Sequence, residues 1–210
     1  MAEKMLITQG LNELKTLDNR IVRAINQANF VVASKKVDKN AKPNETKEEF
    51  SDNAKSSMQQ IKDLIKRREA IKSAIIASNA VTEVEIAGNK MTVAQAIDTK
   101  NSIEYYRRLL ATMKTQYSSA LNKVENVNRT VDENIDQMIL AAYGKEGKDK
   151  ISKDTFDAIA TPYKAANEAE LVDPLKIKDE IDRTQTWIEE FESTVDSKLQ
   201  ISNCMTYIEI

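Results

Sequence analysis

The sequence predicts an all-α protein, an antiparallel bundle of long helices packed as a coiled coil, with a small β-hairpin and strand element at one end. Three observations support this prediction. Glycine occurs 4 times and proline 3 times in 210 residues, so few positions interrupt a helix. Charged residues make up 30% of the chain and aromatic residues 5%, which is typical of long solvated helices. Apolar residues also recur in alternating steps of three and four.

We expect a single elongated helical domain over residues 1–210. Its first helix is predicted over 4–36, where Leu11, Leu14, Leu17, Ile21, Ala24, Ala28 and Val31 form one apolar stripe. The polar stretch 35–46 contains Pro43 and is predicted to be a loop. A second helix over 46–79 begins at a capping box, in which a threonine and a glutamate three residues later satisfy free amides.

The longest regular pattern lies between residues 92 and 143, after a second capping box at Thr92-Val-Ala-Gln95. Apolar residues keep a seven-residue register there, which predicts one long helix supercoiled against a partner helix. One set of positions is Ile103, Leu110, Tyr117, Val124, Val131 and Met138, and the other is Tyr106, Met113, Ala120, Val127, Asn134 and Ala141. Asn134, the polar member, either fixes register or oligomeric state or lies at the solvated end of the seam.

Residues 144–172 are predicted to form an insertion of loop and short helix. Tyr143-Gly144 should end the long helix, and a flexible charged loop should follow it as far as Lys150. A short helix capped by Ser152 is expected next, interrupted by Pro162. The last helix should begin near Asp173-Pro174, with aspartate as the cap and proline at the first helical position.

An internal repeat relates Ser78-Asn-Ala-Val-Thr-Glu-Val-Glu-Ile86 to Ser202-Asn-Cys-Met-Thr-Tyr-Ile-Glu-Ile210. The alternating β-branched residues predict a β-hairpin over 80–93 and a C-terminal strand within 199–210. We expect the hairpin and the strand to meet in one small sheet; the alternative is that the strand pairs with a neighbouring copy. The candidate interaction residues are therefore Val84, Ile86, Tyr207, Ile208 and Ile210, together with Asn134.

Three pieces of the sequence carry a family resemblance. They are the pattern Leu14, Leu17, Arg20 and Ile21, the stretch from Ser78-Asn79 through Gly88 to Thr92-Val-Ala-Gln-Ala-Ile97, and Val195-Asp-x-Lys-Leu-Gln200 before Asn203 and Thr206. Together they resemble the DIP1984 family of small, helical, septicolysin-like bacterial proteins, which has no established activity. The chain departs from the family in its 144–172 insertion and in carrying Asn203-Cys204 where an Asn-Trp pair is expected. In general style it is also similar to bacteriophage virion structural proteins.

Candidate chemistry is sparse, because the chain has no histidine and hence lacks the commonest general base and metal ligand. The carboxylate clusters, Glu48-Glu49, Glu83 with Glu85, Asp132-Glu133-Asp136 and Glu189-Glu190-Glu192, are expected to be solvated; a cation site at Glu83, Glu85 and Glu209 is the minor alternative. Cys204 is expected to be a small buried residue, and Tyr105-Tyr106 to be core. The basic runs Lys66-Arg67-Arg68 and Arg107-Arg108 are expected to be ordinary helix-face charge.

The sequence therefore favours a non-enzymatic structural or assembly protein, most specifically a bacteriophage virion component of the tail, neck or head. Such a chain would act as a homo-oligomer and contact other structural proteins through helices and strands. With a net charge of −2, we expect no nucleic acid partner, and no cofactor, metal, small-molecule substrate or membrane insertion. The alternatives are a cytolysin-like membrane-active protein, a cytosolic bacterial helical protein of unknown role, and an enzyme using carboxylates and a divalent metal. The expected location is the virion, with the cytoplasm as the alternative.

Overall fold

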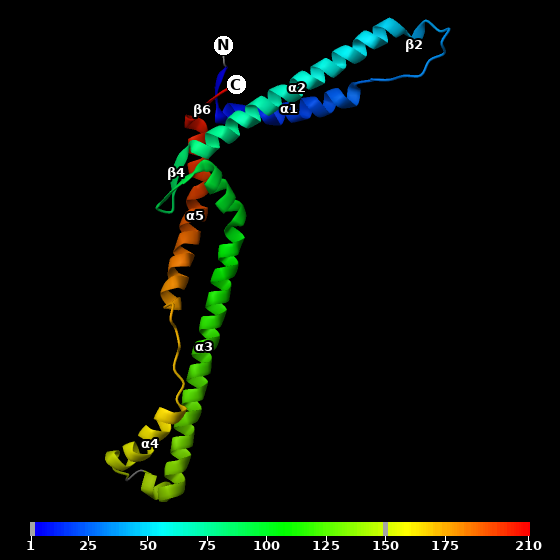
Figure 1. Cartoon of the computed structure of the whole chain (residues 1–210). Helices are drawn as coiled ribbons and strands as arrows, with labels where there is room; N and C mark the ends of the chain where they lie inside the picture. Colours follow the sequence, from blue (N-terminus) through cyan, green and yellow to red (C-terminus); the bar gives the residue numbers. More distant parts are fainter. Residues whose placement is uncertain (1–2, 149–150) are drawn as a thin grey trace. The chain divides into compact units, whose positions relative to one another are not determined.

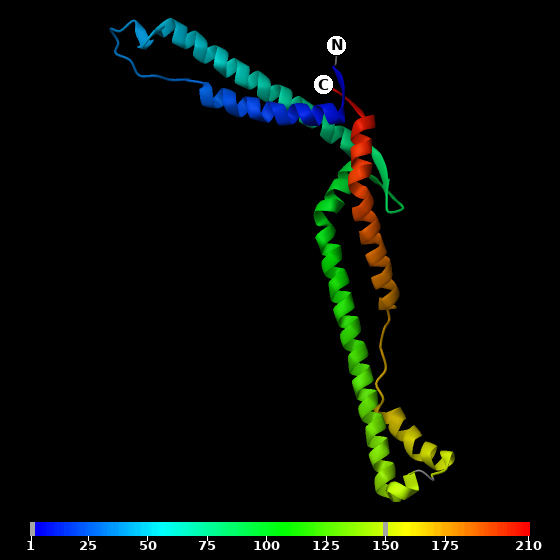
Figure 2. The same cartoon turned by 180° about the vertical axis from the view of Figure 1, so that it is seen from behind.

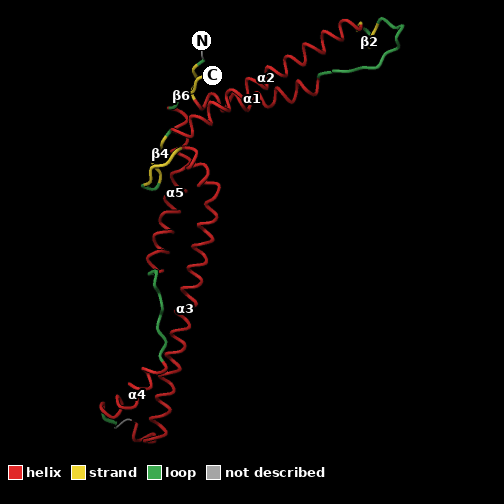
Figure 3. Tube along the Cα trace, in the orientation of Figure 1, coloured by secondary structure: helices red, strands yellow, loops and turns green. Residues whose placement is uncertain are grey.

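The structure, a computed structural model, describes residues 3–148 and 151–210 (Figure 1). Helices dominate the described chain, as Figure 3 shows, and the predicted mostly-α class with small β elements is confirmed. The helices are α1 (Ile7–Gln27), α2 (Lys47–Val81), α3 (Val93–Lys148), α4 (Lys153–Asn167) and α5 (Ile177–Met205). The strands are β1 (Lys4–Leu6), β2 (Asn40–Lys42), β3 (Glu45–Thr46), β4 (Glu83–Ile86), β5 (Asn89–Thr92) and β6 (Tyr207–Glu209).

Contacts group the chain into two compact units, where the sequence predicts one domain. The first unit takes in the chain up to Asn101 together with Glu190–Ile210, and the second takes in Ser102–Glu189. The helices α3 and α5 each run from one unit into the other without a linker. No change of composition therefore marks the boundary, and the hydrophobic pattern alone does not predict it.

In the first unit, α1 and α2 lie side by side and antiparallel in both views (Figures 1 and 2). Their shared core consists of Met5, Ile7, Leu14, Leu17, Ile71, Ile75 and Ile208. This core therefore joins two helices to the strand pair β1–β6. A second set of buried residues in this unit comprises Ile86, Val93, Ala96, Phe191 and Val195.

The predicted strand topology is wrong. The strand β6 does not join the hairpin β4–β5 but pairs with β1 of the same chain, antiparallel, with Met5 opposite Ile208. The strand β1 was not predicted, because its three residues are continuous with the apolar stripe of α1. The sequence pattern of the two elements therefore resembles that of one helix. The third sheet, β2–β3, lies in the predicted loop 35–46, where Asn44 has a positive φ in the turn.

Two helix boundaries also differ from the prediction. α1 ends at Gln27 although apolar spacing continues beyond it. The face of α2 opposite the end of α1 presents Ser57 and Gln60, so a longer α1 would bury little apolar surface. α5 begins at Ile177 rather than near Pro174, so, contrary to the sequence prediction, Asp173 is not the N-cap residue and Pro174 is not the first helical residue. The Asp173 carboxylate still accepts a hydrogen bond from the Ile177 amide at 2.9 Å.

In the second unit, one core cluster consists of Val131, Ile135, Ile139 and Ala160. Met113, Ile181 and Ile188 are also buried in this unit. The seven-residue register holds as far as Val131 and then fails, because the next buried positions are four residues apart. Met138, Asn134 and Ala141 are exposed instead. Gly144 has non-helical angles, as its predicted helix end implies, but helical residues resume after it as far as Lys148. The remainder of the predicted 144–150 loop, residues 149–150, lies outside the described residues.

Candidate functional site

The candidate interaction residues lie in two equivalent strand-and-helix modules within the first unit. The hairpin module consists of the end of α2, β4, β5 and the start of α3. The end module consists of the end of α5, β6, β1 and the start of α1. In each, a helix leads into a strand that pairs antiparallel with a second strand, and the second strand leads directly into another helix.

The pairing register of the two modules is the same. Val84 lies opposite Met91 in the hairpin module, and Ile208 lies opposite Met5 in the end module. The neighbouring pairs repeat a charge pattern, Glu85 opposite Lys90 and Glu209 opposite Lys4. Opposite charges at paired strand positions stabilise an antiparallel sheet, so both modules favour the same register.

Backbone hydrogen bonds repeat as well. The carbonyl of Thr82 accepts from the Val93 amide at 2.8 Å, and the carbonyl of Thr206 accepts from the Ile7 amide at 3.0 Å. Each threonine amide in turn donates to the carbonyl four residues earlier, Ser78 or Ser202. In both modules, one carbonyl thus satisfies the first free amide of the helix that follows.

A second sequence match, which the sequence analysis missed, accompanies the first. Lys90-Met91-Thr-Val-Ala-Gln95-Ala-Ile97 matches Lys4-Met5-Leu-Ile-Thr-Gln9-Gly-Leu11 in its lysine, methionine and glutamine. The two glutamines do the same work: Gln95 Oε1 accepts from the Thr92 amide at 2.8 Å, and Gln9 Oε1 accepts from the Leu6 amide at 2.9 Å. Three identities in eight residues are too few to find without the register to align them.

The modules differ at their tip. In the hairpin module, Ala87 and Gly88 form a two-residue turn with φ of 49° and 72°, the left-handed values that such hairpins require. In the end module, Glu3 and Ile210 occupy the positions of Asn89 and Ile86 and exchange two backbone hydrogen bonds, at 3.1 and 3.0 Å. No turn within the sequence joins these two residues.

The structure separates the candidate residues by burial. Ile86 and Ile208 are buried, Val84 is half-buried, and Ile210 packs against the α1–α2 core. Tyr207 is 56% exposed, and the Lys4 ammonium lies 4.8 Å from its ring centre. Tyr207 is therefore the member of the set that faces solvent, whereas the others hold the modules together.

Asn134 belongs to the second unit. Its side-chain amide donates to the hydroxyl of Tyr163 on α4 at 3.2 Å, and the residue is exposed. Within this chain, the bond therefore links α3 to α4.

Ion pairs bind α1 and β1 to α2 around Arg67. Its guanidinium donates to both Glu13 oxygens, at 2.8 and 3.2 Å, and lies 2.7 Å from a Glu3 oxygen. These hydrogen bonds, first to Glu13 and then to Glu3, raise the pKa of Arg67 further above its ordinary value. Arg68 pairs with Asp18 in the same way. The two arginines of the basic run are thus paired with carboxylates.

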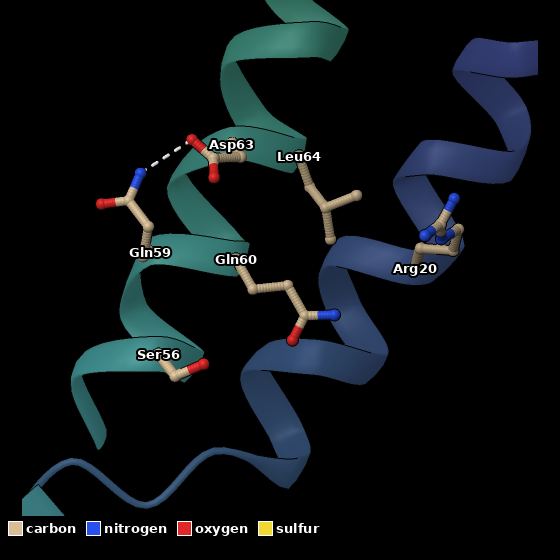
Figure 4. A pocket seen from close by; sticks show the side chains of 6 residues that line it. All are labelled: Arg20, Ser56, Gln59, Gln60, Asp63 and Leu64. Atoms are coloured by element: carbon tan, nitrogen blue, oxygen red, sulfur yellow. Dashed lines mark hydrogen bonds between the residues drawn. The ribbon is translucent and has the colours of Figure 1, made fainter. Parts of the chain in front are cut away.

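A polar cleft of about 490 Å³ lies between α1 and α2 (Figure 4). Its lining consists of Arg20, Ser56, Gln59, Gln60, Asp63 and Leu64. The Gln59 amide donates to Asp63 at 2.8 Å, and Leu64 points toward α1. A second hollow of about 270 Å³ shares Arg20 and Gln60 and adds Arg23 and Gln27. Both hollows lie where polar side chains replace apolar ones between the two helices.

Several other predicted residues lie elsewhere than expected. Cys204 is exposed rather than buried, with its Sγ 3.4 Å from the Thr8 hydroxyl. Tyr105 and Tyr106 are 73% and 42% exposed rather than core, although Tyr106 packs on Trp187 with ring centres 4.6 Å apart. Glu209 lies in a different sheet from Glu83 and Glu85, so the minor cation-site hypothesis fails. Over residues 3–148 and 151–210, no three His, Cys, Asp or Glu side chains gather as a metal site would need.

Comparison with known proteins gives no match to a family model, a curated protein or a solved structure. The class of protein is therefore defined by the fold alone: helices in two compact units, of which the first is organised around a duplicated strand-and-helix module. The resemblance to the septicolysin-like family stays a prediction. None of the described helices has a segment both long and apolar enough to cross a bilayer.

Proposed function

We propose that this chain is a structural assembly protein that works as a homo-oligomer and contacts other structural proteins through its helices and strands. The observation behind the proposal is the exposure of large apolar side chains at equivalent positions of the two modules. Val81 is 76% exposed and Met205 is 74% exposed, and each directly precedes the threonine that ends its helix. Exposed apolar surface that recurs in this way at both helix ends supports a protein contact at these positions.

The strand β6 supports the same proposal. Glu3 and Ile210 form a hydrogen-bonded pair, and antiparallel pairs alternate, so the backbone groups of Tyr207 and Glu209 face away from β1. No further strand of the described chain pairs with β6. An outer edge of this kind favours association with another strand.

Size-exclusion chromatography with light scattering tests the proposal. We expect a mass that is a multiple of the 23.7 kDa chain at micromolar concentration. The double variant Val81→Glu, Met205→Glu should lower that mass by placing charge on the contact surface. A matched control is Val22→Glu, which changes a 58% exposed residue of α1 outside the modules and should leave the mass unchanged. A strict monomer would contradict the proposal.

The most specific form of the proposal is a bacteriophage virion component, associated with the tail, neck or head. It is supported by the general similarity of long, Asn- and Lys-rich helices to such proteins. Genes for capsid, portal or tail-sheath proteins beside the gene for this chain would support it, as would the chain's presence in purified particles by mass spectrometry. Release of dye from liposomes by the purified chain would instead favour the membrane-active alternative.

A further inference from the structure

The end module is assembled from segments at opposite ends of the sequence. In the hairpin module, the turn at Ala87 and Gly88 keeps β5 beside β4 of the same chain. Nothing comparable ties β1 to β6. Between residues 3 and 210, β1 is connected to β6 only through α1 and the elements that follow it. The arm, defined as residues 3–27, thus pairs with β6 without a turn that would restrict it to β6 of the same chain.

The core, ion-pair and strand contacts of the arm join it to α2 and to the chain around β6. Its apolar residues Met5, Ile7, Leu14 and Leu17 share a core with Ile71, Ile75 and Ile208. Its carboxylates Glu3, Glu13 and Asp18 pair with Arg67 and Arg68. None of these contacts requires the arm to belong to the same chain as α2. A second copy would supply the same partners with the same geometry.

The segment after the arm is built as a hinge. Residues 28–34 form no regular secondary structure, and Ala28 is already extended, with φ of −74° and ψ of 144°. Fully extended, seven residues span about 23 Å. Beyond them the chain is fixed to α2, since the Lys47 side chain donates to the Lys35 carbonyl at 2.8 Å. The φ/ψ changes needed to redirect the arm are therefore confined to residues 28–34.

The hinge also exposes apolar surface, since Val31 is 86% exposed and Phe30 is 43% exposed. Burial of these two side chains against a second copy would favour an exchanged form over the closed chain.

From these observations we propose that two copies of this chain exchange arms, so that β1 and α1 of one copy pair with β6 and pack on α2 of the other. This inference rests on the proposed homo-oligomer, in which arm exchange is the contact that joins two copies. Since the arm is buried against α2, exchange requires the arm to undock. The proportion of exchanged dimer is therefore set mainly when the chain folds, and it rises with concentration during folding.

A single substitution reports the exchange directly. The Thr8 hydroxyl lies 3.4 Å from Cys204 Sγ, so Thr8→Cys places two thiols side by side across the arm. Oxidation, or a short bis-maleimide where the disulfide geometry is unfavourable, then joins residues 8 and 204. In a closed chain the link lies within one chain. In exchanged chains it joins two, and a non-reducing denaturing gel shows a covalent dimer.

The outcomes separate the exchange from the proposed function. A covalent dimer whose cross-linked peptides contain residues 8 and 204 supports the inference. An oligomer by light scattering with only intrachain links overturns the inference and leaves the proposed function standing. A monomer with intrachain links overturns both. Two controls exclude chance cross-linking: the unsubstituted chain with Cys204 alone, and Thr16→Cys, which places the thiol about 12 Å further along α1.

Concentration during folding gives a second measurement. We expect the variant refolded from urea at about 100 µM to give several-fold more covalent dimer than the same variant refolded at about 1 µM. The difference should persist after both samples are brought to one concentration before cross-linking. Equal amounts of dimer in the two samples would contradict exchange during folding.

Discussion

The backbone carbonyl of Thr206 accepts a hydrogen bond from the amide of Ile7 at 3.0 Å. Through this bond, the residue that follows α5 provides a partner for the first free amide of α1, as Thr82 does for Val93. A helix that starts near the beginning of the sequence is therefore completed by residues near its end. The first unit therefore forms fully only when both segments are present. The hairpin module, by contrast, is made of segments that are adjacent in the sequence.

Gly10 and Ala96 occupy equivalent positions in the two modules but differ in the room available for a Cβ atom. A Cβ added at Gly10 would lie 3.3 Å from Ile208 Cδ1 and Ile71 Cγ2, whereas Ala96 is fully buried with its methyl group in place. We expect Gly10→Ala to change stability by less than about 1 kcal/mol, because better helix propensity offsets the tight contacts. Gly10→Val should destabilise the first unit by about 2–3 kcal/mol through overpacking.

The reciprocal change at Ala96 serves as the control. Ala96→Gly should cost about 1.5–2 kcal/mol, since it loses both helix propensity and a buried methyl group. Because two units need not unfold together, hydrogen exchange of α1 and α3 amides is a better measurement than one melting temperature. If the amide hydrogens of Gly10→Val exchange at the same rates as those of the unsubstituted chain, the packing around residue 10 is looser than the pairing register of the end module implies.

The capping box of α2 predicts a local pH dependence. Hydrogen bonds from the Thr46 amide, at 2.8 Å, and from the Thr46 hydroxyl lower the pKa of Glu49 below its ordinary value of 4.5. A carboxyl with a lowered folded pKa stabilises the fold above its unfolded pKa, and that stabilisation is lost as the pH falls through the folded pKa. We therefore expect the first turn of α2 to fray below about pH 4.5.

Amide exchange in the first turn of α2, followed between pH 3 and pH 6 with correction for intrinsic rates, measures this effect. Glu49→Gln keeps an acceptor but removes the titration, so its protection should be lower and independent of pH in that range. Glu48→Gln is the matched control, since Glu48 lies beside the box but makes no bond to Thr46. A pH dependence that survives in Glu49→Gln and disappears in Glu48→Gln would contradict the assignment.

The second unit offers a direct test of where the seven-residue register fails. Ile135 is 2% exposed and shares a core with Val131, Ile139 and Ala160, whereas Met138 is 43% exposed. We expect Ile135→Ala to destabilise the contact between α3 and α4 by about 3 kcal/mol, and Met138→Ala by no more than about 0.5 kcal/mol. Urea titration followed by exchange of α4 amides measures both. A larger destabilisation by Met138→Ala than by Ile135→Ala would instead support the seven-residue register that the sequence predicts.

Much of the fold could be predicted from short-range signals. The capping boxes at Thr46 and Thr92 mark helix starts because the same side chains that carry the signal make the bonds. The strand β4 was likewise visible in the alternation of its residues. The long-range strand pairing was predicted wrongly. Whether β6 pairs with β4 or with another strand depends on three residues, Lys4–Leu6, whose local pattern matches a helix.

The candidate interaction residues were partly predictable for a related reason. Ile86 and Ile208 belong to the repeat visible in the sequence, but their burial depends on partners in other elements. Tyr207 and Ile208 are adjacent in an alternating strand, and only the pairing with β1 decides which of them faces solvent. The exposure of Val81 and Met205 likewise depends on how the helix ends pack. Sequence periodicity contains no information on either point.

The equivalence of the two modules makes a final prediction about connectivity. Ile210 and Glu3 take the positions of Ile86 and Asn89, which a two-residue turn joins. Linking Ile210 to Glu3 through Asn-Gly, a pair suited to the positive φ of such turns, and opening the chain between Ala87 and Gly88 should therefore exchange the roles of the modules. We expect this permuted chain to keep its helical circular dichroism and to melt within about 5 °C of the original.

A chain carrying the same new link but opened between Arg67 and Arg68 is the control. This opening breaks α2 beside the ion pairs to Glu13 and Asp18, so it should lose the packing of α1. The permuted chain also tests the equivalence of the modules independently of arm exchange. Once a turn joins β1 to β6, β1 is held beside β6 of the same chain. A linked chain that folds as well as the original, and no longer forms cross-linked dimers through residues 8 and 204, is the result that the duplicated register requires.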